Sequence, residues 1–307
     1  MLNGIINIHK EAGFTSHDVV AKMRGICGQK KIGHTGTLDP QATGVLPVCL
    51  GSGTKLCDML TDKDKEYVAE LLLGVTTDTQ DTTGEVLSRC EVLSKKQDPE
   101  RGFSEEVIRE AVMSFVGAYE QVPPMYSALK VNGKKLYELA REGKEVERKA
   151  RPVTIHEIEI LKIELPIVKM RVLCSKGTYI RTLCADIGEK LGCGGTMQSL
   201  VRTKVSSFLL QNAITLGQLQ NLKDEGRLPE AVISVDCMFA EYPALHVQEK
   251  WRSLLENGNA LFPSQTVENI TCGDGWVRIY REDGSFAGIY AYDSDRKWYK
   301  PVKMFLG

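Results

Sequence analysis

Several features that would assign this 307-residue chain to a protein class are missing. Its nine cysteines are an odd number and are scattered, with no Cys-x-x-Cys pair. This distribution argues against a disulfide framework and a zinc ribbon, and it is typical of a reducing compartment. The sequence also lacks a cluster with metal-ligand spacing and a Gly-Lys-Ser/Thr phosphate loop. We therefore expect no metal and no cofactor.

Long hydrophobic runs are missing as well. The first apolar stretch, Ile5 to Ile8, is short and is soon followed by Lys10 and Glu11, which does not fit a signal peptide. No run reaches the length needed to cross a bilayer. We expect a cytoplasmic protein that does not associate with membranes.

The chain has almost no net charge, but positive charge is concentrated in two segments. The net charge is −1, which by itself gives no indication of a nucleic-acid partner. Residues 130–151 carry eight Lys/Arg against four Glu, a local charge of +4, and residues 169–204 carry seven against two acidic residues, a local +5. From residue 236 onward there are eight basic and ten acidic residues, a local −2. Two basic segments in the larger part of the chain fit a polyanion such as RNA, although solvated helix faces also produce such runs.

The order of predicted elements favours an α+β core followed by a smaller β-rich domain. The predicted strands of the core cover residues 4–9, 45–50, 67–73, 153–163 and 167–174. The predicted helices run from Ser16 to Gly28, near 54–61, from Ser104 to Gly117, from Thr178 to Leu191, and from Thr215 onward. After a predicted helix at 248–256, strands at 275–281, 286–292 and 297–305 succeed one another with Gly/Asp turns. We expect domains at 1–240 and 241–307, the first with a mixed sheet.

The most unusual segment is residues 33–47, GHTGTLDPQATGVLP. Three glycines, three threonines and two prolines around Asp39 predict a tightly turned loop. Pro40 disfavours a helical backbone at Asp39, so the carboxylate is held on a defined turn. Local composition alone favours the alternative that Asp39 is a turn residue that binds its own backbone. A phosphate loop fits less well, because no Gly-Lys-Ser/Thr follows.

This segment resembles the active-site motif of the bacterial TruB-type tRNA pseudouridine synthases. Three further blocks match the family in the same order: Asp64–Tyr67 (DKEY), Pro123–Glu138 (PPMYSALK…GKKLYE) and Cys174–Arg181 (CSKGTYIR). The resemblance covers residues 1 to about 235. The β-rich end is similar in position and strand texture to the small PUA-like RNA-binding domain of these enzymes.

The resemblance implies roles for residues that carry little information alone. It implies that Asp39 is the catalytic residue, that Arg181 keeps its carboxylate charged, and that Tyr67 receives the base flipped out of the RNA stack. It also implies substrate contacts for the residues His34, Tyr179, Leu200, Lys10 and Lys130. Outside this context Arg181 would read as a surface arginine, His34 as a structural histidine, and Tyr67 and Leu200 as core residues.

The resemblance further implies a fold and a substrate. The fold is a pseudouridine synthase core with a mixed, mainly antiparallel sheet, and an insertion at about 122–152 grips the RNA. The substrate is uridine 55 of tRNA, in the T-loop of the T-arm, and no protein partner is implied. The same chemistry on another RNA, as in guide-dependent relatives, is an alternative that the acidic segment from 236 disfavours. An RNA-binding and folding module without turnover is a second alternative.

Overall fold

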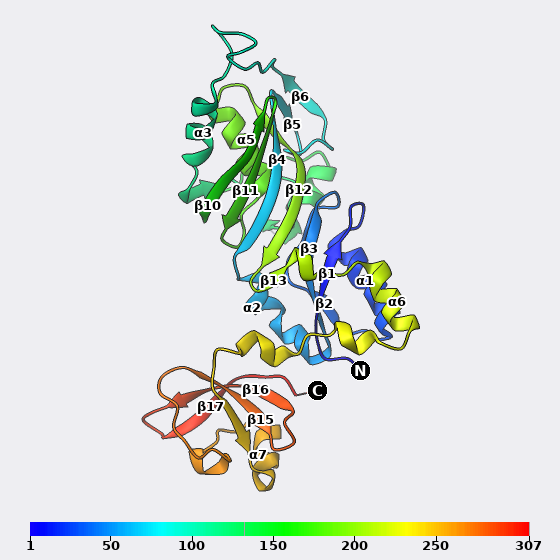
Figure 1. Cartoon of the computed structure of the whole chain (residues 1–307), viewed down its shortest axis with the longest axis vertical. Coiled ribbons are helices and arrows are strands. Elements are labelled where there is room, and N and C mark those ends of the chain that lie inside the picture. The colour runs from blue at the N-terminus through cyan, green and yellow to red at the C-terminus, as the bar shows by residue number, and fades with distance from the viewer. Residues whose placement is uncertain (132, 307) are drawn as a thin grey trace.

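A computed structural model describes residues 1–131 and 133–306, so residue 132 of the expected insertion and the last residue of the expected second domain lie outside the described residues. One large sheet forms the centre of the chain up to residue 240 (Figure 1). Its spatial order is β1 (Gly4–Lys10), β3 (Thr43–Leu50), β12 (Gly195–Val205), β4 (Lys65–Leu73), β11 (Ile167–Cys174), β10 (Arg151–Glu164) and β7 (Gly117–Gln121). Short strands extend it: β2 (Ile32–His34) pairs with β3, and β13 (Phe208–Leu209) with β12.

The expected mixed, mainly antiparallel sheet is confirmed. Strands β3 and β12 run parallel, through Thr43 opposite Val201 and Gly44 opposite Arg202. The other described pairs of this sheet are antiparallel. The parallel contact joins the start of the chain to its far half, and it lies beside the loop that carries Asp39.

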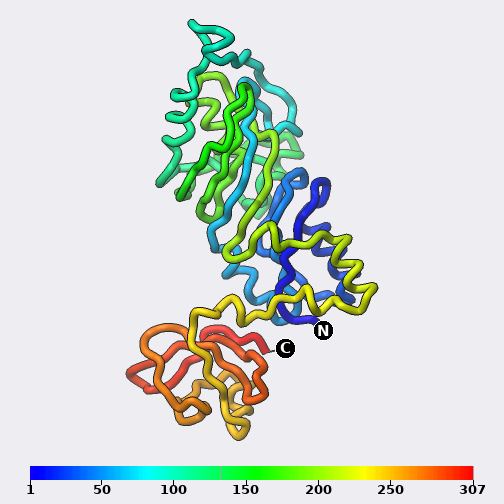
Figure 2. The backbone as a smooth tube through the Cα atoms, viewed as in Figure 1, coloured from blue at the N-terminus to red at the C-terminus, as the bar shows by residue number. Residues whose placement is uncertain are grey.

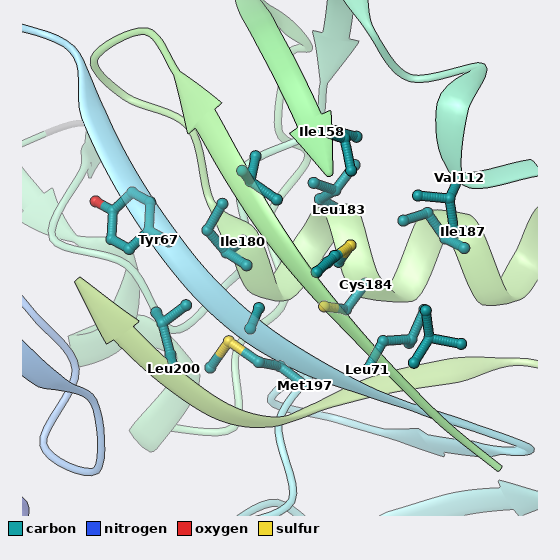
Figure 3. Packing of buried hydrophobic residues seen from close by; sticks show 14 of the residues in the cluster. Tyr67, Leu71, Val112, Ile158, Ile180, Leu183, Cys184, Ile187, Met197 and Leu200 are labelled. Carbon is teal, nitrogen blue, oxygen red and sulfur yellow. The ribbon is translucent and has the colours of Figure 1, made fainter. Parts of the chain in front are cut away.

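Helices cover the sheet at two places (Figure 1). The helices α3 (Glu105–Met113) and α5 (Ile180–Lys190) bury their apolar sides against β4, β10, β11 and β12, while α1 (Ser16–Cys27) and α6 (Leu216–Asp224) pack beside β1 and β3. Figure 3 shows the first of these cores, in which α5 contributes Ile180, Leu183 and Ile187. None of the helices that the structure describes is long and apolar enough to cross a membrane.

Short elements connect these layers. They are η1 (Gly51–Leu56), α2 (Cys57–Thr61), β5 (Val75–Thr77), β6 (Val86–Arg89), β8 (Lys130–Val131), β9 (Lys134–Lys135), α4 (Leu136–Arg141), η2 (Leu210–Asn212), η3 (Leu228–Ala231) and η4 (Val235–Phe239). Strands β8 and β9 form a small hairpin, which with α4 makes up the structured part of the insertion.

A separate four-stranded sheet forms the C-terminal region. Its order is β14 (Ala244–Val247), β15 (Trp276–Arg281), β16 (Phe286–Asp293) and β17 (Trp298–Met304), accompanied by η5 (Glu249–Trp251), α7 (Arg252–Glu256) and η6 (Pro263–Gln265). It has its own core around Leu245, Tyr290 and Tyr299. A shared apolar cluster also joins Ile289 and Phe305 of this region to the large sheet. Accordingly, the chain in Figure 2 returns to the junction near its C-terminal end.

The helix predicted from Ser16 does begin there, although its cap is the residue before, whereas the end predicted for α3 at Gly117 was wrong. Helix α1 is capped by Thr15, whose hydroxyl accepts from the Asp18 amide while the Asp18 carboxylate accepts from the Thr15 amide. The Ser16 hydroxyl instead serves the Asp39 loop by accepting from the Leu38 amide. Helix α3 ends at Met113 and not near Gly117, because Gly117 has a φ of 108° and opens β7.

Candidate active site

Asp39 lies in the loop between β2 and β3, and hydrogen bonds from β1 and α1 fix this loop. The ammonium group of Lys10 donates to the carbonyl of Pro40 at 3.0 Å and to that of Ala42 at 2.6 Å. Ser16 accepts a hydrogen bond of 2.9 Å from the amide of Leu38, the residue before Asp39. The Ala42 amide closes the turn onto the Asp39 carbonyl at 3.1 Å. The backbone on both sides of the carboxylate is therefore restrained.

Strand β12 holds the other side of the loop through Arg202. Its Nε donates to the Val45 carbonyl at 2.7 Å, and its Nη2 donates to the Gly36 carbonyl at 3.2 Å. Gly44 allows this close approach, because a Cβ at this position would lie 2.2 Å from the Arg202 carbonyl oxygen. The φ of Gly44 is also 108°, a conformation that L-residues with side chains rarely adopt.

Arg181, in the first turn of α5, forms a two-point ion pair with Asp39. Its Nε lies 2.9 Å from Asp39 Oδ2, and its Nη2 lies 3.2 Å from Oδ1. The remaining guanidinium donors bind the carbonyls of Thr79 at 3.0 Å and Tyr126 at 2.8 Å. Oδ2 of Asp81 lies 3.8 Å from Nη1 of the same guanidinium. The planar guanidinium group is oriented by four partners. It therefore fixes the direction of the Asp39 carboxylate and also compensates its negative charge.

The pKa of Asp39 reflects opposing influences. Burial raises the pKa of this carboxyl above its usual value, the charge of Arg181 lowers it, and the charge of Asp81 raises it further. The side chain of Arg181 is only 5% exposed, whereas that of Asp39 is 35% exposed. The guanidinium thus lies behind the carboxylate, which remains accessible to a ligand.

Tyr67 and Leu200 lie side by side on the buried face of the sheet (Figure 3). Tyr67 is on β4 directly opposite Arg202 of β12, and Leu200 is opposite Ala69, one step further on the same face. The phenol oxygen points away from the apolar cluster in Figure 3. Burial raises the pKa of Tyr67, and the neighbouring charge of Arg202 lowers it. An aromatic ring and an apolar side chain are therefore adjacent.

Tyr179 immediately precedes α5 and is half-buried. The Gln121 side chain fixes its backbone, by accepting from the Tyr179 amide at 2.7 Å and donating to the Tyr179 carbonyl at 2.9 Å. Burial raises the pKa of the Tyr179 phenol. Gln121 thereby sets where α5 begins and hence where Arg181 points.

His34 ends β2 at the beginning of the Asp39 loop. Its Nδ1 accepts from the Gly36 amide at 3.3 Å, and its ring meets that of His17 edge-on with 5.3 Å between centroids. Burial, together with the nearby His17 and Arg202, lowers the pKa of His34 to about 4. The ring is therefore neutral at pH 7 and carries its proton on Nε2.

The two predicted basic substrate contacts occupy different environments. Lys10 is fully buried, and burial lowers its pKa to about 8, although the charge of Asp39 opposes this shift. Its ammonium group binds carbonyls of the Asp39 loop and of Glu11. Lys130 is exposed on β8. The insertion reaches the site through its Tyr126 carbonyl, which accepts from Arg181.

Three contributors to the site were missed in the sequence. Arg202 lies in β12, a strand that was not predicted from the sequence, and Gln121 precedes the Pro-Pro block without being part of it. The loop from Thr79 to Asp81 holds Arg181 and is also tied to α5, because Thr182 donates to the Gln80 side chain at 2.8 Å. Its dense Thr and Asp content, TTDTQDTTG, was the available signal. Within residues 1–131 and 133–306, no group of three or more His, Cys, Asp or Glu side chains could hold a metal ion.

Known proteins resemble this chain along nearly its whole length. The model of the TruB family pseudouridylate synthase N-terminal domain matches residues 24–180, and that of the tRNA pseudouridylate synthase B C-terminal domain matches residues 181–240. The tRNA pseudouridine synthase B of Lachnoclostridium phytofermentans is 52% identical over 99% of this chain and 100% of its own length. That of Alkaliphilus oremlandii is 45% identical, over 99% of both chains.

Solved structures share the fold. A chain in the crystal structure of a Cbf5-Nop10-Gar1 complex superposes with a TM-score of 0.69 and 27% identity, covering 99% of this chain and 85% of that one. A chain of the archaeal box H/ACA sRNP Nop10-Cbf5 complex gives a TM-score of 0.68 and 25% identity, over 99% and 86%. From the family models over residues 24–240 and the close relatives along nearly the whole length, the chain belongs to the TruB family of pseudouridylate synthases.

Proposed function

We propose that this protein isomerises uridine 55 in the T-loop of tRNA to pseudouridine, with Asp39 as the catalytic residue. The observation that carries the proposal is the carboxylate of Asp39, held by two guanidinium nitrogens of Arg181 and still 35% exposed. The relatives named tRNA pseudouridine synthase B support tRNA as the substrate. The choice of uridine 55 rests on the resemblance of the catalytic motifs.

The reaction breaks the N-glycosidic bond of uridine and forms a C-glycosidic bond, without net oxidation or reduction. It needs a carboxylate near the sugar and the base that acts as a nucleophile or as a base. An ionised carboxylate in a pocket that excludes water is unfavourable, so a cation must offset its burial. Arg181 supplies that cation and aims the carboxylate, and the hydrogen bonds of the loop keep Asp39 in place during base rotation.

The base must leave the RNA stack before Asp39 can reach it. Tyr67 offers an aromatic face to the flipped uracil, Leu200 closes the apolar side of the pocket, and Tyr179 contributes a second contact. His34, which carries its proton on Nε2, donates a hydrogen bond to the RNA and helps hold the nucleotide out. Lys10, which is buried, acts on the substrate by positioning the loop and by its charge.

The remaining parts of the chain bind the RNA around this pocket. In this proposal the catalytic domain covers residues 1–240, its insertion at about 122–152 grips the T-arm, and Lys130 contacts phosphate. Residues 241–307 form a PUA-like domain that extends the RNA surface. The chain acts without a protein partner and in the cytoplasm, where tRNA is modified.

Tritium release tests the proposal. A T-arm minihelix that carries 5-tritiated uridine should release tritium in the presence of the protein, and mapping of the product should place pseudouridine at position 55. A minihelix with cytidine at this position is the matched control and should release none. Product at another position would refute the choice of uridine, and no product in any tRNA would refute the activity.

A further inference from the structure

Arg202 is a fully buried cation in β12. Its side chain is 1% exposed and is the largest among the fully buried side chains. In the part of the chain that the structure describes, no Asp or Glu oxygen lies within 4.0 Å of its guanidinium. A buried charge without a counter-charge is strongly unfavourable unless its donors are bound to polar groups. The presence of such a costly group near the proposed active site suggests that its positive charge has a function.

The neighbours of Arg202 are elements of the proposed reaction centre. The guanidinium binds the carbonyls of Gly36 and Val45, on either side of Asp39 in the chain. Its third neighbour is the hydroxyl of Tyr67, the residue directly opposite Arg202 across β4 and β12. Because opposite residues of an antiparallel pair project to the same face, the guanidinium and the phenol oxygen are brought together by the register of the two strands.

The charge of Arg202 acts on several titratable groups. It lowers the pKa of the Tyr67 phenol, against the effect of burial, and it adds to the effect of burial in lowering the pKa of Lys10, His34 and Lys65. The phenol stands out among these groups, because it alone becomes an anion when it loses its proton. A positive centre beside the phenol oxygen therefore stabilises the phenolate.

The proposed isomerisation calls for such an anion. Pseudouridine has lost the proton that uridine carries on C5 and has gained one on N1. This exchange balances if the Tyr67 hydroxyl gives its proton to N1, and its oxygen then accepts the C5 proton while the electron pair of the C5–H bond stays in the uracil ring. Between these two transfers the oxygen carries a negative charge, and no oxidant, reductant or other co-reactant is required.

We propose that Arg202 is a positioning residue that orients the Tyr67 hydroxyl and stabilises its phenolate form between the two proton transfers. This inference rests on the proposed function and on the proposed role of Tyr67. The two arginines of the site then have different roles. Arg181 orients the carboxylate that reacts with the substrate, and Arg202 orients the phenol that exchanges protons with the base. Only the second role makes removal of the C5 proton depend on Arg202.

The test compares Arg202→Met and Arg202→Lys in single-turnover reactions on T-arm RNA with hydrogen or deuterium at C5. Arg202→Met should slow turnover by about 100-fold, as expected for lost acid–base assistance. Its affinity for tRNA should stay close to wild type, and a larger isotope effect should appear because C5 deprotonation limits the rate. Arg202→Lys keeps the charge and should recover part of the loss. Titration of ¹³C-labelled tyrosine, assigned with Tyr67→Phe, should show a higher pKa for Tyr67 in Arg202→Met.

Thr203→Val is the matched control on the same strand, because Thr203 faces away and donates to Glu66 at 2.7 Å. It should change neither the isotope effect nor the titration. The inference would be overturned if Arg202→Met turned over normally. It would also be overturned if Arg202→Met turned over slowly and bound tRNA weakly, while the isotope effect and the Tyr67 titration stayed unchanged. If Arg202→Met does not fold, the same criteria apply to Arg202→Lys, which loses the planar fork. Failure of the wild-type protein to form product would overturn the proposed function itself, and the tyrosine titration does not depend on turnover.

Discussion

Arg181 binds both carboxylate oxygens of Asp39, with Nε 2.9 Å from Oδ2 and Nη2 3.2 Å from Oδ1. The guanidinium is buried while the carboxylate remains partly exposed, so the pair presents its acidic end to the outside. The carbonyls of Thr79 and Tyr126 hold the arginine from behind. This arrangement gives the carboxylate both a fixed direction and access for a ligand.

Asp39→Asn should abolish detectable pseudouridine formation, with a loss of about 10⁴-fold or more, as is usual when a catalytic group is removed. The amide is nearly isosteric, and Arg181 keeps Thr79, Tyr126 and Asp81 as partners, so the fold should remain intact. Tritium release measures the activity and circular dichroism the fold. Turnover by Asp39→Asn comparable to wild type would refute the assignment. Asp39→Glu is the control, because it keeps the negative charge but places the carboxylate further from the backbone.

Arg181→Met should move the acid limb of the pH–rate profile to higher pH. Burial raises the pKa of Asp39 and Arg181 lowers it, so loss of the arginine lets this pKa rise. Because the reaction needs ionised Asp39, activity would then be lost at a higher pH on acidification. The rate of the chemical step should fall more than tRNA affinity. An unchanged acid limb combined with weaker RNA binding would make Arg181 a phosphate contact instead.

Tyr67→Phe and Tyr67→Ala separate stacking from proton transfer. Stacking on an aromatic face contributes about 1–3 kcal/mol per base, and both Tyr and Phe provide it. We expect Tyr67→Phe to bind tRNA normally but to stall in single-turnover assays, because the hydroxyl that exchanges protons is missing. Tyr67→Ala should lose binding of the flipped base and turnover together. A fully active Tyr67→Phe protein would exclude the role of the hydroxyl.

Shortening residues 130–150 should raise the dissociation constant for tRNA and flatten its dependence on salt. These residues provide most of the local positive charge of the insertion, and a protein that makes fewer phosphate contacts releases fewer counterions on binding. Binding measured between low and physiological salt gives the slope. Lys162→Gln on β10, an exposed lysine paired with Glu164, is the control and should leave the slope unchanged. Normal affinity and slope in the shortened protein would show that the basic run is only a solvated face.

The sequence revealed those parts of the site that lie in short, unusual motifs. Asp39 lies in a loop marked by glycines, threonines and prolines, and Arg181 ends the block CSKGTYIR. Their roles and their pairing were implied only by the resemblance. The β-rich end and the hairpin between β10 and β11 were visible in alternation and turn residues.

The contacts that the sequence did not reveal depend on the register of paired strands and on which of two similar residues makes a given hydrogen bond. Arg202 meets Tyr67 only because β12 pairs with β4 in one particular register, which the local sequence does not specify. Thr15 and Ser16 both fit a helix cap, and the choice depends on Leu38, which takes the Ser16 hydroxyl. The role of Lys10 was likewise set by distant carbonyls in the Asp39 loop.

Val45 takes part in two mechanical connections at once. Its carbonyl receives Arg202, and its side chain packs into the apolar cluster that contains Ile289 and Phe305 of the C-terminal sheet. A displacement of the C-terminal sheet can therefore reach the Asp39 loop through Val45. Packing around Phe305 thus contributes to the restraint of the loop as well as to the stability of the C-terminal sheet.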